Sequence, residues 1–334
     1  MSELRKDPIT DRWVIIASER GVRPSDFETV TTVQSGGFCP FCPGNEHAAP
    51  HEILAFRRHA TERDSPGWMV RVIPNRYPAL GIEGTLEREG EGLYDRMTGI
   101  GAHEVIIETP DHRATLADLP VRELEQVLQA WRERIVDLRR DARLQHILVF
   151  KNRGAAAGAT LEHEHSQLVA LPLVPREVRA ELDGAARYFA FRERCVLCDV
   201  IRQERRDGRR MIFENDRFAV LAPYASRVPF QIWVLPKAHR SHFDAVRREE
   251  LASLAEALRL VLRKLDRALE RPAYNLVVQT APLRQEPSPS YHWRLEIAPQ
   301  LARPGGFEWG SGCAINPTPP EEAAAFLRQL EPEP

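Results

Sequence analysis

The sequence is organised around residues 158–171, which read Gly158-Ala-Thr160-Leu-Glu162-His163-Glu164-His165-Ser166-Gln167-Leu168-Val-Ala-Leu171. Two histidines alternate with other residues, and the segment then becomes apolar. Side chains alternate between the two faces of a β-strand, so this pattern predicts a strand with both imidazoles on one face, roughly 6 to 7 Å apart. An isolated His-x-His pair also fits two solvated histidines on an edge strand. The rest of the sequence must therefore distinguish a site from a surface pair.

Length and charge limit the classes of function. With 334 residues, the chain can form a large core and two domains or one duplicated domain. The 46 Lys and Arg against 48 Asp and Glu give a net charge of -2, so no overall basic field favours nucleic acid. No apolar run is long enough to span a membrane, and the N-terminal residues lack the apolar core of a signal peptide. We therefore expect a cytoplasmic protein with no membrane or nucleic-acid partner.

The five cysteines form two short pairs and one single residue. The pairs are Cys39-Pro-Phe-Cys42 and Cys195-Val-Leu-Cys198, and Cys313 stands alone. In a reducing compartment a Cys-x-x-Cys pair favours a metal site over a disulfide. For either pair taken alone, a thioredoxin-like redox pair is the alternative. Two pairs in one chain, each followed by histidines, favour zinc.

Hydrophobic periodicity predicts the same elements twice. Apolar residues recur at helical spacing between Pro120 and Arg143 and again between Leu251 and Leu269, which indicates one amphipathic helix in each half. Strands are expected at Trp68–Pro74, His103–Glu108, His146–Lys151, Tyr274–Gln279 and His292–Ile297. We place the two halves at residues 1–188 and 189–334.

The two halves also repeat the order of their cysteines and histidines. The distance from His112 to His163 is 51 residues, and that from His239 to His292 is 53. Two thiolates and two imidazoles are a ligand set that zinc favours. The predicted first zinc site is Cys39, Cys42, His112 and His163, and the second is Cys195, Cys198, His239 and His292. His242 is the alternative ligand in the second site.

The halves differ at the position of His165. The second half has His292-Trp-Arg294 where the first has His163-Glu-His165. Arginine is always charged and cannot act as a neutral nucleophile. Only the first half should carry covalent chemistry, and the second should act as a scaffold or substrate support.

Several motifs occur in a fixed order along the chain. They are Cys39-Pro-Phe-Cys42-Pro-Gly, Pro110-Asp-His112, the His163-x-His165-x-Gln167 segment, Pro236-Lys-Ala-His239 and Gly306-Phe-Glu308-Trp-Gly-Ser-Gly. In this order they resemble the galactose-1-phosphate uridylyltransferase family of the histidine-triad superfamily. The resemblance runs nearly end to end. It implies an α+β fold of two tandem histidine-triad-like halves, with antiparallel sheets flanked by amphipathic helices. It also implies a homodimer that exchanges a uridylyl group between UDP-glucose and galactose 1-phosphate through a nucleotidyl-histidine.

The resemblance assigns roles to individual residues. It makes His165 the nucleophile, Gln167 the amide that holds the phosphoryl oxygens, and His163 a zinc ligand. Substrate contacts are implied for Arg20, Arg23, Asn75, Asn152, Gly158, Thr160, Phe307 and Glu308, the last reached across the dimer interface. The chain departs from the family where Arg76 replaces an aspartate, Phe307 replaces a tyrosine, and a glutamine expected near Ala314 is missing. The tail through Asn316-Pro317 also resembles the related ADP-glucose phosphorylases, so both nucleotides stay open.

The chemistry requires a neutral imidazole. A covalent intermediate divides one displacement between two anions into two easier steps. Gln167 stands where histidine-triad hydrolases carry a third histidine, and an amide cannot shuttle protons at neutral pH. Sugar phosphates leave and attack as ionised oxygens and need little proton transfer, so the sequence favours a phosphate acceptor over water. A nucleotide hydrolase and a zinc-stabilised nucleic-acid-binding module are the alternatives of other classes.

Overall fold

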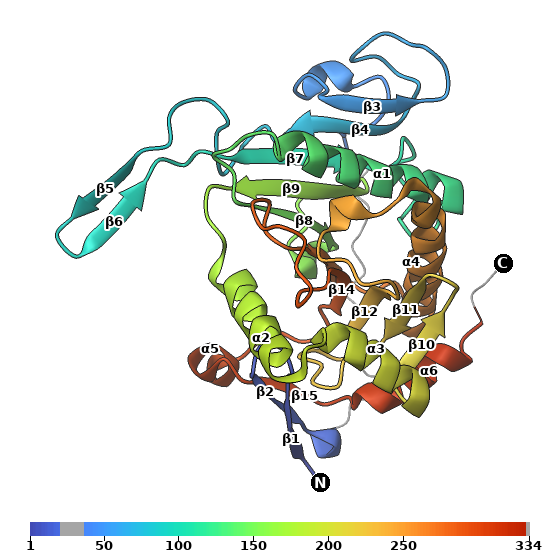
Figure 1. Ribbon diagram of the computed structural model, residues 1–334. Coiled ribbons are helices and arrows are strands. Elements are labelled where there is room, and N and C mark those ends of the chain that lie inside the picture. The colour runs from blue at the N-terminus through green and yellow to red at the C-terminus, as the bar shows by residue number, and fades with distance from the viewer. Residues whose placement is uncertain (21–36, 332–334) are drawn as a thin grey trace.

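Ten strands from both halves form one continuous antiparallel sheet in the computed structural model, which describes residues 1–20 and 37–331 (Figure 1). The sheet order is β10-β11-β12-β14-β13-β8-β9-β7-β4-β3. The strands of the first half are β3 (Leu54–Arg57), β4 (Trp68–Pro74), β7 (Ala102–Ile107), β8 (His146–Arg153) and β9 (His165–Leu171). Those of the second are β10 (Met211–Glu214), β11 (Phe218–Leu221), β12 (Ile232–Pro236), β13 (Tyr274–Gln279) and β14 (Arg294–Pro299). The predicted α+β class and the duplication are confirmed.

The two halves meet where β8 pairs with β13. Reading outward from this seam, the first half runs β8-β9-β7-β4-β3 and the second runs β13-β14-β12-β11-β10. The strand orders are therefore equivalent, and each strand has a counterpart in the other half. The predicted pair of sheets is joined into one because antiparallel pairing at the seam satisfies the backbone groups of two strands that would otherwise be edges.

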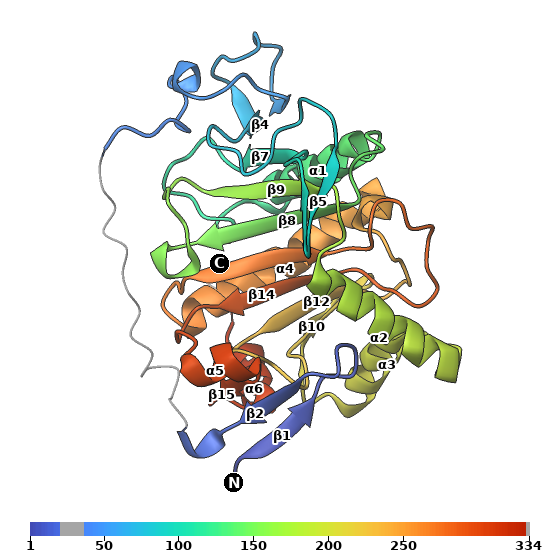
Figure 2. The same cartoon turned by 90° about the vertical axis from the view of Figure 1, so that its left-hand side faces the viewer.

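One long helix from each half covers the same face of the sheet. These are α1 (Val121–Leu138) and α4 (Arg248–Ala268), which pack against each other, and Figure 2 shows them behind the strands. Their apolar faces and the facing side chains of the strands form one core that includes Trp131, Leu258 and Trp293. The helix predicted to reach Arg143 ends at Leu138, because residues 139–145 turn back into β8.

The remaining elements surround this sheet. Helices α2 (Arg176–Arg192) and α3 (Val196–Asp207) pack with the opposite face of the second half. The strands β1 (Glu3–Lys6), β2 (Trp13–Ile16) and β15 (Ala314–Asn316) form a small sheet that joins the two ends of the described chain. The hairpin of β5 (Arg88–Glu91) and β6 (Tyr94–Met97) projects from the body in Figure 1. The shorter segments are η1 (Ser18–Arg20), η3 (Glu46–Ala48), η4 (Ala155–Ala157), η5 (Phe243–Ala245), α5 (Gly306–Ser311) and α6 (Pro320–Gln329).

The predicted boundary between the halves, after residue 188, falls within α2, and it stays a prediction. Among the described residues, no helix combines the length and the apolar character that crossing a bilayer requires.

Candidate active site and metal centres

The first predicted zinc site is assembled from three distant segments. The sulfur atoms of Cys39 and Cys42 and one ring nitrogen each of His112 and His163 lie within 4.8 Å of one another. Nδ1 of His163 is 3.6 Å from both sulfurs, and Nδ1 of His112 is 3.3 Å from Cys42. Nε2 of His163 donates to the carbonyl of Thr109 at 2.7 Å, so the Nδ1 lone pair faces the sulfurs. Metal-binding histidines commonly have such a partner.

Local turns create the cysteine knuckle. The amide of Cys42 donates to the carbonyl of Cys39, and the Asn45 side chain donates to the same carbonyl at 2.8 Å. Burial, followed by the neighbouring Cys39, raises the pKa of the Cys42 thiol to about 11. Because a divalent cation binds thiolates and favours their deprotonation, this donor set fits a Cys2His2 metal ion.

The second predicted site repeats this arrangement. Cys195, Cys198, His239 and His292 also bring their ligand atoms within 4.8 Å of one another. Nδ1 of each histidine is 3.4 Å from Cys198. His292 Nε2 donates to the Pro236 carbonyl at 3.0 Å, matching His163 and Thr109.

His242, the alternative ligand, lies outside the second cluster. Its Nε2 donates to the carbonyl of Pro282 at 3.1 Å, and its Nδ1 is 2.8 Å from the hydroxyl of Ser241. Both ring nitrogens therefore have other partners, and the structure favours His239 as the ligand.

His165 begins β9 as a buried, neutral imidazole. Its Nδ1 donates to the carbonyl of His163 at 2.7 Å, which leaves the lone pair on Nε2. Burial, assisted by the positive charge of Lys151, lowers the pKa of His165 to about 4. His163 precedes β9, yet the rings of His163 and His165 both contact Phe41, at centroid distances of 6.2 and 5.5 Å. The predicted strand therefore does not include His163, although both imidazoles contact Phe41, and neutral His165 has the protonation state of a nucleophile.

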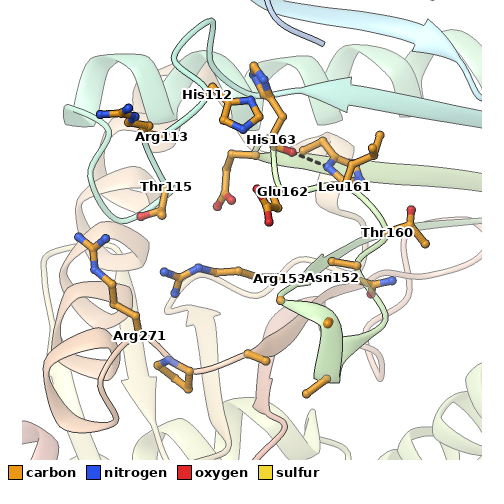
Figure 3. A pocket seen from close by; sticks show the side chains of 18 of the residues that line it. His112, Arg113, Thr115, Asn152, Arg153, Thr160, Leu161, Glu162, His163 and Arg271 are labelled. Carbon is orange, nitrogen blue, oxygen red and sulfur yellow. Dashed lines mark hydrogen bonds between the residues drawn. The ribbon is translucent and has the colours of Figure 1, made fainter. Parts of the chain in front are cut away.

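A cavity of about 450 Å³ opens beside this imidazole. Its wall includes His165, Asn152 and Thr160 from the first half and Glu270 to Ala273 from the second. Figure 3 shows His112 and His163 on one side of the cavity and Arg153 and Arg271 on the other. Gly158 turns the chain here with a φ of +88°, a conformation that strongly favours glycine.

Hydrogen bonds orient the amides of Gln167 and Asn152. His103 Nδ1 accepts from the amide of Ala79, so His103 Nε2 carries the proton and donates to Gln167 Oε1 at 2.8 Å. Asn275, from the second half, donates to Asn152 Oδ1 at 2.8 Å. In each amide the oxygen is the accepting atom, so the NH₂ group remains as a donor; Asn152 lines the cavity, and Gln167 is not among its lining residues. Sequence reasoning missed His103 and Asn275, because only strand pairing reveals their partners.

The other predicted substrate residues do not all lie beside His165. The side chain of Asn75 is 3.1 Å from His103 Nε2, next to the Gln167 amide. Phe307 and Glu308 belong to α5, which lies by β2 and β15, away from β9 in Figure 1. Within one chain they do not meet His165, and their reach across a dimer stays a prediction. The side chain of Arg20 and all of Arg23 lie outside the described residues.

Comparison with known proteins matches nearly the whole chain to one family. The model for the N-terminal domain of galactose-1-phosphate uridyl transferase matches residues 1–175, and that for its C-terminal domain matches residues 181–305. An ADP-glucose phosphorylase from Arabidopsis thaliana is 39% identical over 98% of this chain and 93% of its own length. A galactose-1-phosphate uridylyltransferase from Thermotoga maritima is 28% identical over 100% of both chains. A solved Arabidopsis ADP-glucose phosphorylase with bound ADP-glucose has a TM-score of 0.83 and 36% identity, covering 99% of this chain and 100% of its own.

Proposed function

Because the chain belongs to the galactose-1-phosphate uridylyltransferase family, we propose that it transfers the nucleotidyl group of a nucleoside diphosphate sugar through a covalent adduct on His165. The observation that carries this proposal is the buried imidazole, whose Nδ1 donates to the His163 carbonyl while Nε2 keeps its lone pair. Nucleotidyl transfer from a nucleotide sugar is the chemistry common to the relatives. Which nucleotide is transferred, and to which acceptor, is proposed separately below.

In the first step Nε2 of His165 attacks the phosphorus next to the nucleoside. The N–P bond forms as the bond to the sugar phosphate oxygen breaks, and the sugar 1-phosphate leaves as an ionised anion. The proton on Nδ1 remains hydrogen-bonded to the His163 carbonyl, so no general acid is required. The NH₂ groups of Gln167 and Asn152 meet the charge on the phosphoryl oxygens.

In the second step another phosphate takes the nucleotidyl group from His165. The attacking oxygen is already ionised, and Gln167 therefore suffices where a hydrolase would use a third histidine. Bound zinc would supply structural restraint at His163, since four protein ligands leave no open position for water. Arg20 and Arg23 are proposed to complete the phosphate pocket.

We favour ADP-glucose as the donor and inorganic phosphate as the acceptor. This choice is supported by the 39% identity to the Arabidopsis ADP-glucose phosphorylase, against 28% for the Thermotoga uridylyltransferase. UDP-glucose with a hexose 1-phosphate, the first choice from the sequence, is the second candidate. The ordered motifs shared with the uridylyltransferases support it.

The test uses ADP-glucose and UDP-glucose, each radiolabelled in the phosphate attached to the nucleoside. The wild-type protein should retain label from the true donor in an acid-labile, base-stable adduct, and His165→Gly should not. Inorganic phosphate or a hexose 1-phosphate should then remove the label, which identifies the acceptor. Transfer that survives in His165→Gly would contradict the mechanism, and steady release of nucleoside monophosphate without an acceptor would indicate a hydrolase. Metal content and circular dichroism of His165→Gly serve as controls for folding.

A further inference from the structure

A cluster of three charged side chains lies buried against the strand that carries His165. Lys151 Nζ donates to Glu108 at 2.6 Å and lies 3.0 Å from Glu164. The exposed fractions of Lys151, Glu108 and Glu164 are 1%, 1% and 5%. One oxygen of Glu108 has no hydrogen-bond partner at all. Two carboxylates and one ammonium group are thus held together in the core, where unpaired charge is unfavourable.

Each member of the cluster adjoins a residue of the proposed site. Lys151 Nζ also donates to the main-chain carbonyl of His165 at 2.9 Å. Glu164 lies between His163 and His165, and its carboxylate accepts from the amide of Leu116 at 2.8 Å. Glu108 precedes Thr109, whose carbonyl accepts from His163. The cluster therefore connects the nucleophile's main chain to the two loops that carry His112 and His163.

The second half has the same fold but different residues at the positions of the cluster. When the β13–β14 pair is superposed by register on the β8–β9 pair, Val278 corresponds to Lys151. Trp293, which precedes Arg294, corresponds to Glu164, which precedes His165. Leu235 and Pro236, at the end of β12, occupy the region of Glu108. All four are buried and none is charged. Yet this half brings together the same four metal-ligand types, with their ligand atoms also within 4.8 Å of one another.

The cluster could serve either the stability of its half or the position of His165. If these charges served only to fold the half or to shape its metal centre, the second half should need them as well. Apolar residues of similar size usually replace a buried ion pair without loss of stability. The charges occur in the half that has His165 and are absent from these positions in the half that has Arg294. Their presence correlates with the nucleophile.

We propose that Lys151, held by Glu108 and Glu164, is a positioning residue that fixes the main chain of His165 so that Nε2 meets the phosphorus in line. The ammonium group restrains the carbonyl of His165, and the carbonyl of His163 restrains its ring. Together they fix both ends of the nucleophilic residue. This inference rests on the proposed nucleotidyl transfer through His165.

The main test replaces all three charges at once, so that no unpaired charge is left in the core. The variant combines Glu108→Gln, Lys151→Met and Glu164→Gln, which nearly preserve side-chain shape. Single-turnover labelling by the nucleotide sugar gives a rate constant and an amplitude. We expect the rate constant to fall about 100-fold, as for a misplaced reacting group. The amplitude, the affinity for the nucleotide sugar and the metal content should stay at wild-type values.

A matched control removes another buried lysine. Lys264 of α4 donates to the carbonyls of Leu327 and Leu330, far from β9, and Lys264→Met should leave the rate constant unchanged even where it lowers stability. A purely structural role for Lys151 predicts a lower amplitude with an unchanged rate constant. That outcome would overturn the inference. A wild-type protein that takes up no label would instead refute the proposed function.

If the triple variant does not fold, a conservative single variant provides the test. Lys151→Arg keeps the positive charge but moves its donors and enlarges the side chain. The inference requires a lower rate constant at full amplitude in this variant. A wild-type rate constant in Lys151→Arg would contradict it.

Discussion

At the scale of single residues, the proposed chemistry depends on hydrogen bonds that fix otherwise free groups. His165 is orientated by the carbonyl of His163, and Gln167 is orientated by His103. A flipped amide would present its oxygen instead of its NH₂ group to a phosphate oxygen, which is repulsive. His103 therefore belongs to the site although it does not touch the proposed nucleophile.

His103→Leu removes the donor that orientates Gln167. We expect kcat to fall about tenfold, because a net hydrogen bond contributes about 1 to 1.5 kcal/mol, while KM for the nucleotide sugar changes little. Steady-state kinetics measure both. His59→Leu, an exposed position after β3, is the matched control. An unchanged kcat in His103→Leu would show that Gln167 is held by other contacts.

His146 links stability to pH. It is 1% exposed, neither ring nitrogen has a hydrogen-bond partner, and burial lowers its pKa to about 4. In the unfolded chain its pKa is about 6.5, so only the unfolded state binds the proton between these values. The stability contributed by neutral His146 is complete above pH 6.5 and is lost as the pH falls toward 4. Its full loss corresponds to about 3 kcal/mol.

Urea unfolding of the wild type and of His146→Leu at several pH values tests this linkage. The free energy of unfolding of the wild type should fall relative to the variant as the pH decreases from 7 to 4. A constant difference would mean that His146 is accessible to protons in the folded state.

At the scale of elements, the seam between β8 and β13 makes one structure of two halves. Val277 of β13 pairs with Phe150 of β8 on one side and with Glu296 of β14 on the other. Asn275 of the same strand orientates Asn152. The second half thereby supports a residue that lines the cavity beside His165, and its role as a scaffold stays a prediction.

Val277→Pro should disrupt this seam. Proline removes an amide donor from the hydrogen-bond ladder of a central strand, a position that normally excludes it. Circular dichroism in urea should show a lower midpoint, and transfer should decrease with it. Val277→Thr, which stays β-branched, should remain close to the wild type. Unfolding of Val277→Pro at the wild-type midpoint would show that the two halves are stable independently of the seam.

At the scale of the whole molecule, we expect the two candidate metal centres to have different roles in transfer and stability. The first adjoins His165, and the second lies in the other half. Cys198→Ala should reduce the metal content from two ions per chain to one and lower stability while transfer persists. Cys42→Ala should also leave one ion, but it should abolish transfer because its partner His163 lies two residues before the proposed nucleophile, His165. Elemental analysis with single-turnover labelling measures both, and equal effects of the two variants would contradict separate roles.

The family resemblance predicts an active site shared by two chains, and α5 lies away from His165 of its own chain. In the proposed homodimer, Glu308 of one chain reaches the sugar bound beside His165 of the other. Co-expression of His165→Gly with Glu308→Ala should restore about a quarter of the wild-type activity, because each mixed dimer regains one intact site. Either variant alone should stay inactive or severely impaired. Absence of recovery in mixed dimers would show that Glu308 acts within its own chain.

The duplicated α+β plan, the two Cys2His2 sets and the family could all be predicted from the sequence. These depend on short motifs and on periodicity, which are local properties of the chain. Only the tertiary structure decided which side chains meet across strands. The Lys151 cluster, the link from His103 to Gln167 and that from Asn275 to Asn152 join residues up to 123 positions apart. Strand register determines these contacts, and it depends on the packing of the whole sheet.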